Sequence, residues 1–569
     1  MDKNFFIAIL LTIAIIFVFS SKWYQNNFGR DLPPKTTVEA PETGTSSPPP
    51  STLQQKTAIT ENEQAITAEK SESLPETPVL TQINKSEEKN VSLENDDITV
   101  TFNTRGGAIV NATMKQFSGL DKNTLVQLVT PDQAWCTGEI VDNDTVISLS
   151  DLVFEISGRS ENHIAFAVDL STQVRIIREY TLEPEGFLLK TDTKLEGTWN
   201  NPEIYFTWNG PLNYTEAPVK QLRIWPFTMF MRDETKIYNK IAYLGQGDRT
   251  ITDDSGKVKT KRIYSKEGAQ KQSVRKTSGS QHVFDGDLDW YAVRNKYFMT
   301  AAIPLQKTRW KATSQSGLSN GRNWFDFTIS KRISDGDTSL NIFLGPISYN
   351  LLKSYNYNLT EIMELSWRFI RPLSIGFLWL IKKIHAVIPN WGLVIILFSI
   401  IIKVVLYPLS KTSIESMRKM SSLQPQITEL KEKYKNNPQK QHMAMMDLYK
   451  KEGINPMSGC LPMLLQMPVF FALYPVVGKA FELRQALFIP NWIVDLSRPD
   501  PFFILPVAMG LSMFFQTKST MKDPNQKAMM YVMPVMMVIL FANFSSGLTL
   551  YWFMFNIMTL VQQKLVKAH

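Results

Sequence analysis

Long apolar runs divide this chain of 569 residues into parts of different character. One run lies near the beginning, at residues 5–19. Five more lie in the last third of the chain, at about 391–410, 459–481, 501–517, 528–544 and 546–563. A helix of about 20 apolar residues matches the ~30 Å hydrocarbon core of a bilayer. The pattern therefore predicts a polytopic α-helical membrane protein with six spans, five of them forming a core over residues 391–569.

The run at 391–410 contains a cation near its middle, Lys403, and Ser399 lies one turn before it on the same helix face. A lysine at the centre of a span costs roughly 2.5–3.5 kcal/mol on insertion scales, so something must offset that cost. One interpretation is that the lysine stem extends to the headgroups near Lys411. The other is that Lys403 faces a polar, hydrated groove inside the membrane. The pattern leaves both interpretations open.

Other predicted spans also carry polar side chains. Gln466 lies in the third span, and the sixth places Thr549, Trp552, Asn556 and Thr559 at steps of three, four and three, which is one helix face. Polar residues in spans often only join helices, and this is the simpler interpretation of any one of them. Because no span holds a carboxylate that would neutralise the lysine, the combination predicts a site for polypeptide of mixed polarity. Five methionines in the fifth span suit varied apolar partners.

The first apolar run predicts a retained membrane anchor over residues 1–24, because a lysine and two aromatic residues follow it directly. A cleaved signal peptide is the competing interpretation, but no Ala-x-Ala-like cleavage site is present. Residues 25–92 are rich in Pro, Ser, Thr and Glu. Such a composition cannot bury enough apolar area to offset chain entropy, so this stretch predicts a disordered periplasmic tether.

Residues 93–348 show short segments in which apolar and polar residues alternate, separated by turn pairs such as Asp-Gly and Gly-Gly. Many short strands without intervening helices predict an all-β sandwich or a large antiparallel β domain. The polar and basic stretch at 249–281 predicts a long exposed loop in this domain.

Two segments next to the apolar runs are also predicted to be helical. Residues 349–390 predict a linking helix followed by an interfacial amphipathic helix with cations on one side. The loop at 410–458 has apolar residues at helical spacing, with Asn437 and Pro438 as an N-cap and first-turn pair and Gly453 as a stop. It predicts a charged helical hairpin. A solvated connector and a docking surface for a polyanionic or chaperone-like partner are both open interpretations.

The distribution of charge predicts the orientation. The formal net charge is +8, and nine Lys and Arg residues lie between positions 410 and 458. Because cytoplasmic loops are enriched in cations, both ends are predicted to lie in the cytoplasm and residues 30–370 in the periplasm, with the spans in a bacterial inner membrane. The cations cluster beside the spans and no aromatic-basic RNA-binding pattern appears, so the sequence does not predict direct, sequence-specific nucleic-acid binding.

The sequence shows no arrangement that is typical of catalysis or of metal binding. The topology places Cys136 and Cys460 on opposite sides of the membrane or nearly so, which disfavours a disulfide. His163 and His282 lack metal-ligand spacing with any other His or Cys. No P-loop and no Ser-His-Asp arrangement is visible. We therefore predict no catalytic residue, no metal site and no cofactor.

Two other functions compete with the handling of polypeptides. A secondary transporter with Lys403 as its coupling site predicts internal repeats and paired ionisable groups. A membrane-tethered periplasmic carbohydrate-active enzyme predicts convergent carboxylates or histidines in the sandwich. Neither pattern stands out in the sequence. Trp208, Trp290 and Tyr291 could line a cleft, but core or surface packing is the simpler interpretation.

Several segments resemble one known family. Residues 455–474, which read NPMSGCLPMLLQMPVFFALY, are similar to the signature of the YidC family of membrane protein insertases. Further similar segments are Tyr407–Lys411, Leu423–Pro425, Glu482–Gln485, Ser546–Tyr551, Arg105–Gly107 and Asp289–Tyr291. The resemblance covers nearly the whole chain except the tether.

This resemblance implies a five-helix insertase core with a hydrophilic groove open to cytoplasm and lipid, and a periplasmic β-supersandwich domain. It implies an insertase and chaperone, not an enzyme, that receives nascent membrane proteins alone or with the Sec translocon, with the ribosome and the signal-recognition-particle receptor as further partners. The expected groove residues are Lys403, Ser399, Gln466, Thr549, Trp552 and Asn556. Bacterial members usually have arginine where this chain has Lys403, so the planar bidentate fork is absent here.

Overall fold

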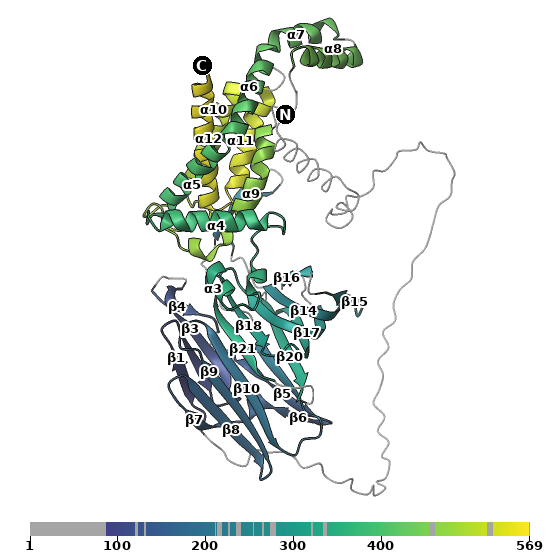
Figure 1. Cartoon of the computed structure of the whole chain (residues 1–569), viewed down its shortest axis with the longest axis vertical. Coiled ribbons are helices and arrows are strands. Elements are labelled where there is room, and N and C mark those ends of the chain that lie inside the picture. The colour runs from purple at the N-terminus through teal and green to yellow at the C-terminus, as the bar shows by residue number, and fades with distance from the viewer. Residues whose placement is uncertain are drawn as a thin grey trace, which may run out of the picture. The chain divides into compact units, whose positions relative to one another are not determined.

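A computed structural model describes residues 87–567, with gaps at 120–122, 130–132, 211, 213–214, 216–218, 226–227, 235–239, 254, 265–266, 274–279, 320–321, 334–337, 436, 454–460 and 521–526. The predicted anchor and most of the predicted tether lie outside these residues, as does Cys460. The described chain contains a β domain followed by a group of helices (Figure 1).

The first half of the β domain is made of short strands. They are β1 (Asn90–Glu94), β2 (Ile98–Asn103), β3 (Ala108–Ser118), β4 (Leu125–Gln127), β5 (Trp135–Asp142), β6 (Thr145–Ser148), β7 (Glu155–Arg159), β8 (His163–Ser171), β9 (Val174–Leu182), β10 (Leu188–Gly197) and β11 (Glu203–Asn209). A short 3₁₀ helix, η1 (Leu149–Asp151), follows β6. Burial alternates along these strands as the sequence pattern predicts, for example in β2, where Ile98, Val100 and Phe102 are buried.

The second half contains longer strands. They are β12 (Val219–Trp225), β13 (Thr228–Glu234), β14 (Lys240–Thr252), β15 (Val258–Ile263), β16 (Gln270–Ser273), β17 (Gln281–Arg294), β18 (Phe298–Pro304), β19 (Arg309–Ser319), β20 (Arg322–Arg332) and β21 (Leu340–Pro346). Antiparallel pairing runs continuously in the order β7-β8-β9-β10-β21-β18-β17-β19-β20-β11-β5-β3-β2-β1. The prediction of an antiparallel β-sandwich domain is confirmed as a curled antiparallel sheet.

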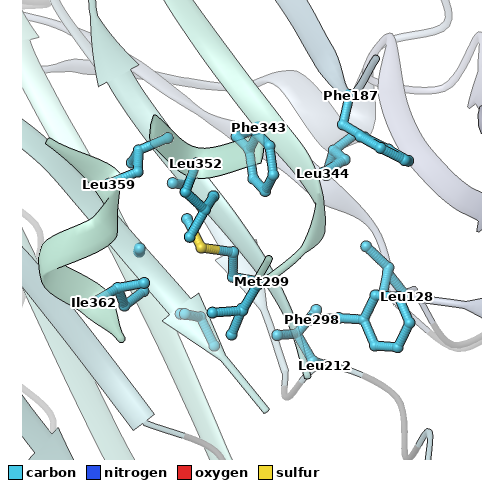
Figure 2. Packing of buried hydrophobic residues seen from close by; sticks show 14 of the residues in the cluster. Leu128, Phe187, Leu212, Phe298, Met299, Phe343, Leu344, Leu352, Leu359 and Ile362 are labelled. Atoms are coloured by element: carbon cyan, nitrogen blue, oxygen red, sulfur yellow. The ribbon is translucent and has the colours of Figure 1, made fainter. Parts of the chain in front are cut away.

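The interior of the β domain is apolar and extends to the segment that follows it. Figure 2 shows Phe298 and Met299 of β18 and Phe343 of β21 near Leu352 and Leu359. These last two residues belong to α3 (Tyr349–Ser354) and to the 3₁₀ helix η5 (Leu359–Ile362), and both are fully buried. Burial of a leucine or phenylalanine side chain contributes about 1.5–3 kcal/mol. Trp208, Trp290 and Tyr291 are also core residues, with at most 2% of each exposed.

A buried arginine explains the Arg105–Gly107 segment. Arg178 is fully buried, and its guanidinium donates to the backbone oxygens of Gly106 at 2.5 Å and of Cys136 at 2.6 Å. Gly106 and Gly107 adopt φ of +73° and +56°, a region that favours glycine, and in this conformation the carbonyl oxygen of Gly106 faces the guanidinium. Burial raises the pKa of the Cys136 thiol, so the group beside the guanidinium stays neutral.

Residues 249–281 are not one long loop, contrary to the sequence prediction. β14 continues to Thr252, and β15 and β16 pair with it. Polar pairs across the strands support this ribbon, including Thr250 with Thr260 at 3.0 Å and Arg262 with Asp248 at 3.0 Å. Since β15 is exposed at five of its six positions, it lacks the buried face that makes a strand visible in a sequence.

The linking segment is also less regular than predicted. The sequence predicts a linking helix at the start of residues 349–390, but α3 ends at Ser354 and only η5 follows before the next helix. Asn356 and Asn358 adopt φ of +59° and +56°, which a right-handed helix cannot accommodate. The segment predicted as an interfacial helix contains α4 (Arg371–His385), with Phe377 and Ile381 among its buried residues and Trp379 exposed. Its place at a membrane interface stays a prediction.

The remaining helices form a second packed region. They are α5 (Trp391–Val405), α6 (Tyr407–Ser422), α7 (Gln424–Lys433), α8 (Pro438–Lys451), α9 (Leu461–Lys479), α10 (Ile504–Thr520), α11 (Lys527–Phe541) and α12 (Ser546–Lys567), with the 3₁₀ helix η7 (Phe481–Leu483) after α9. α12 contacts α5, α9 and α10, and α4 crosses one end of α5 and α9 (Figure 1). Among the described residues, none of the helices combines the length and apolar character needed to cross a membrane. The count of six spans therefore stays a prediction.

α7 and α8 pair with each other through a small apolar cluster of their own. Leu423 and Ile427 are buried against Met445, Leu448 and Tyr449. The turn between the two helices follows the sequence prediction, because the side chain of Asn437 accepts a hydrogen bond from the backbone N–H of Lys440 at 3.0 Å. α8 then ends at Lys451, and Gly453 has φ of +62°.

The Glu482–Gln485 segment connects the helices to the β domain. The ring of Phe481 lies 5.0 Å from that of Phe117 and 5.5 Å from that of Phe298, both nearly edge-on. Arg484 donates to the backbone oxygen of Ser118 at 2.7 Å. These contacts give the segment a packing role at the base of α9.

Candidate functional site

α5 places Lys403 against α12. The helix begins after Asn390, whose side chain accepts from the backbone N–H of Leu393 at 3.0 Å. Lys403 is 5% exposed, and its Nζ donates to Oγ1 of Thr559 at 2.8 Å and lies 4.1 Å from the centre of the Phe555 ring. Among the described residues it forms no ion pair. The ammonium is therefore held by a hydroxyl and a ring face, both neutral.

Ser399 lies on α5 one turn before the lysine and is fully buried. Its hydroxyl donates to the backbone oxygen of Ile395 at 2.7 Å, within its own helix. Such a bond uses the only hydroxyl proton, so Ser399 offers a neighbouring group only its oxygen lone pairs. Ser399 and Lys403 are both buried on α5, but their side chains bond to different partners among the described residues.

Gln466 joins α9 to α12. Its Nε2 donates to the hydroxyl of Tyr551 at 2.8 Å, and both side chains are buried. Tyr551 is not among the predicted groove residues. Its membership of the family-like Ser546–Tyr551 segment was the one feature of the sequence that could have pointed to it.

Asn556 and Thr549 make contacts that join or stiffen helices. Nδ2 of Asn556 donates to Oγ of Ser512 at 3.1 Å and to the backbone oxygen of Met509 at 3.4 Å, both on α10. Oγ1 of Thr549 donates to the backbone oxygen of Ser545 at 3.1 Å. Interhelical bonds of this kind contribute about 0.6–2 kcal/mol in a membrane. The described contacts of these two residues fit the simpler interpretation of polar residues in spans.

Trp552 belongs to a group of aromatic rings. Its ring lies 5.6 Å from that of Phe470 on α9 at 84°, and 5.4 Å from that of Phe541 on α11 at 55°. Phe470 is also near Tyr474 and Phe544, at 5.9 Å and 6.3 Å. Edge-on rings at these separations contribute about 0.5–1.5 kcal/mol beyond the area that they bury.

The predicted polar face of α12 is thus divided among its neighbours. Thr559 meets α5 and Asn556 meets α10, whereas Trp552 meets α9 and α11. The reason is that α12 has neighbours on several sides, so residues only 80° apart around a helix contact different partners. The six predicted residues all lie within this helical region, but the contacts of the described residues do not bring them together around one shared cavity.

One buried amide on α12 is not among the predicted groove residues. Gln562 is 5% exposed, and neither its Nε2 nor its Oε1 has a partner among the described residues. It lies three residues after Thr559 on α12. A buried polar group without a partner costs about 1–3 kcal/mol. This amide and the ammonium of Lys403 therefore mark one end of α12 as unusually polar inside.

Comparisons with known proteins match the chain over nearly its whole length. Residues 383–569 match the family described as 60Kd inner membrane protein, and residues 90–375 match the YidC periplasmic domain. Membrane protein insertase YidC of Francisella tularensis subsp. novicida is 32% identical over 587 aligned residues, which cover 99% of this chain and 98% of that protein. Membrane protein insertase YidC of Chlorobaculum tepidum is 29% identical over 519 residues, covering 84% and 82%.

A solved structure described as an active YidC insertase with its first transmembrane domain resolved covers 85% of this chain and 94% of that one, at 19% identity and a TM-score of 0.35. The sequence matches carry the assignment. The chain belongs to the YidC family, whose members are membrane protein insertases of the inner membrane rather than enzymes.

Proposed function

We propose that this chain receives nascent membrane proteins in a polar groove beside α5 and α12, passes their short hydrophilic tails across the membrane, and releases their apolar segments sideways into lipid. Lys403, Ser399, Gln466, Thr549, Trp552 and Asn556 line or support this groove. The protein acts alone or with the Sec translocon, and it meets substrates delivered by the ribosome and the signal-recognition-particle receptor. The partners follow from the family resemblance.

The observation that carries the proposal is the environment of Lys403. An ammonium has three N–H donors, and the described contacts give it one hydroxyl acceptor and one ring face. Its charge is met only by neutral groups, so an acidic side chain of a substrate tail would be a better partner. The unpartnered amide of Gln562, one turn further along α12, supports a polar path at the same end.

The energetics favour a groove over a full crossing of the bilayer. A hydrophilic tail must pass an apolar slab, and a groove that admits water part of the way shortens that slab. The apolar segment of the substrate then enters lipid, where burial contributes about 25 cal/mol per Å² of apolar surface. This step uses no nucleotide, and the sequence contains no P-loop motif.

Site-specific crosslinking tests the groove directly. A photoreactive residue at position 559 or 562 should crosslink to a stalled nascent chain with one apolar segment. Thr559 contacts Lys403, and Gln562 lies one turn after Thr559 on α12. Leu511 on α10 is 55% exposed and serves as the matched control on another surface. Equal yields at all three positions, or crosslinks at Leu511 alone, would place the substrate elsewhere.

The orientation is a second part of the proposal. We expect both ends in the cytoplasm and residues 30–370 in the periplasm, because Lys and Arg gather in the loop at 410–458 and after the later spans. Protease added to spheroplasts should cut between residues 25 and 92 and spare the 410–458 loop. Cleavage of that loop from outside would reverse the assigned orientation.

A further inference from the structure

A cavity of about 470 Å³ lies where the linking segment meets α9. Its wall is aromatic, with Trp367, Phe470, Phe471, Tyr474 and Phe544. The rings of Trp367 and Phe471 lie 4.9 Å apart, and those of Tyr474 and Phe544 lie 5.5 Å apart. Lys403 is not among its lining residues, so this cavity is separate from the site proposed above.

The charged residues that line the cavity, which we call its mouth, carry an excess of positive charge. Lys271, Lys479 and Glu364 line it. Nζ of Lys479 lies 2.6 Å from Glu364, and Lys240 pairs with the same carboxylate. Although burial raises the pKa of Glu364, Lys479, Arg294 and the bond from Lys240 together lower it well below its usual value. The carboxylate is therefore ionised, and it is shared by more than one cation.

Lys271 at the mouth and the neighbouring Arg294 form no ion pair among the described residues. Nζ of Lys271 donates to the backbone oxygen of Met363 at 3.1 Å. Arg294 is buried, and its guanidinium donates to the backbone oxygens of Asn295, Lys296 and Ile362 at 2.9–3.0 Å. Carbonyl oxygens satisfy the donors, whereas both positive charges share the nearby Glu364 carboxylate with Lys240 and Lys479, so the cations outnumber the anions here.

The surface next to the cavity has the composition of a membrane interface. Trp367 is 43% exposed and Phe369 is 59% exposed, and their rings lie 5.7 Å apart. Trp379 on α4 is 61% exposed. Aromatic side chains of this kind sit at the headgroup level of a bilayer. The arginines at positions 368 and 371 lie in the same segment, which ends in the interfacial helix.

From this geometry we propose that the cavity binds an anionic phospholipid, with the phosphate near Lys271 and an acyl chain along the aromatic wall. An apolar wall alone would accept any hydrocarbon chain, including an apolar segment of a substrate. The excess of cations over anions at the mouth selects a ligand that also carries a negative charge at one end. A glycerophospholipid with a single net negative charge combines both features. The proposal does not depend on insertion activity.

Native mass spectrometry of the full-length protein in detergent tests the charge selectivity. Phosphatidylglycerol and phosphatidylcholine with the same acyl chains are added in turn, and lipid retention is measured. Phosphatidylglycerol should be retained more strongly, and Lys271→Gln should weaken its retention about five-fold, the effect of one lysine on an anionic headgroup. Lys271→Arg should restore it. Lys259→Gln, a change of the same charge on exposed β15, should have no effect.

Equal retention of the two lipids, or equal losses in Lys271→Gln and Lys259→Gln, would overturn the proposal. Glycerophosphoglycerol, which is the same headgroup without acyl chains, should not compete, because it cannot use the aromatic wall. Competition at comparable concentration would show a simple phosphate site and would also overturn the proposal.

Crosslinking in vesicles tests the location. A photoreactive residue at Tyr474, which is 40% exposed, is compared with one at Val535 on α11, which is 60% exposed. In vesicles that contain both lipids, the ratio of phosphatidylglycerol to phosphatidylcholine adducts should be higher at Tyr474. Equal ratios at the two positions, or adducts with polypeptide only, would contradict a lipid site in this cavity.

The pH dependence gives an independent readout. Desolvation of the ammonium, followed by the charge of Arg294, lowers the pKa of Lys271 to about 8, although the residue as a whole is exposed. The charged groups around it are Lys240, Arg294, Glu361, Glu364, Arg371 and Lys479. Raising the pH from 7 to 9.5 removes the proton of Lys271, so retention of phosphatidylglycerol should fall. The fall should be much smaller in Lys271→Arg, and an equal fall in both proteins would contradict a role for Lys271.

Discussion

Replacing Lys403 by glutamate is expected to lower insertion of substrates whose translocated tails are acidic by at least about 30-fold. The ammonium lies inside the helical region with only a hydroxyl and an aromatic ring as described partners. Two unit charges 4 Å apart interact by about 1 kcal/mol in water and about 4 kcal/mol at an effective dielectric constant near 20. Loss of this attraction in Lys403→Ala should lower insertion at least about five-fold, and repulsion in Lys403→Glu should roughly double the free-energy change.

The measurement is insertion of one single-span substrate with acidic, neutral or basic tails into membranes that contain each variant. Lys403→Met is the matched control, because it keeps an unbranched stem against Phe555 and removes only the charge. It should behave like Lys403→Ala for acidic tails, and Lys403→Arg should be tolerated. If all variants insert the three tails equally, electrostatics has no part in the mechanism. If Lys403→Ala fails where Lys403→Met does not, packing rather than charge explains the effect.

The environment of Lys403 shows what the sequence could and could not predict about the site. The isolated cation is visible from the sequence, because Lys403 interrupts a long apolar run that the sequence already predicts as a helix. The acceptor on Thr559 is not visible, since it lies 156 residues away and depends on how two helices pack. Gln562 is harder still, because an amide near a chain end resembles an ordinary exposed residue until its burial is known.

The partners of the polar face of α12 could not be predicted, for a different physical reason. A hydrophobic or polar stripe predicts one shared surface when a helix has one neighbour and one solvent face. α12 contacts α5, α6, α9 and α10, and Trp552 also meets α11, so a stripe 80° wide serves several interfaces at once. Gln466 illustrates the same limit, since its partner is Tyr551 on a flank of α12 outside the predicted stripe.

In the β domain, the strands with a buried face were predictable and the ribbon of β14, β15 and β16 was not. Period-two alternation arises only where one face is buried. β15 is held by backbone pairing and by polar contacts such as Arg262 with Asp248, which leave no apolar pattern. The linking segment failed because two asparagines adopt positive φ, and asparagine tolerates that conformation without requiring it.

The paired helices α7 and α8 can be removed without opening the main core. Their apolar cluster, centred on Leu423 and Ile427, is separate from the cluster that contains the β domain and the other helices. Between Gln424 and Lys451 there are six lysines and three acidic residues, so the hairpin carries a net positive charge. Exposed Met443 and Met446 add an adaptable apolar surface. These features fit a docking surface better than a passive connector.

Deletion of Gln424–Lys451 is therefore expected to lower insertion by about tenfold or more, which corresponds to the loss of only 1.4 kcal/mol of partner binding. The protein should remain embedded in the membrane and keep the melting temperature of its β domain. A glycine-serine linker of the same length is the control for chain connectivity, and a hairpin with its six lysines replaced by glutamine is the control for charge. If the partner recognises charge, the glutamine variant should resemble the deletion, whereas its full activity would assign recognition to the apolar surface. Full activity of the linker variant would show that the hairpin only connects α6 to α9.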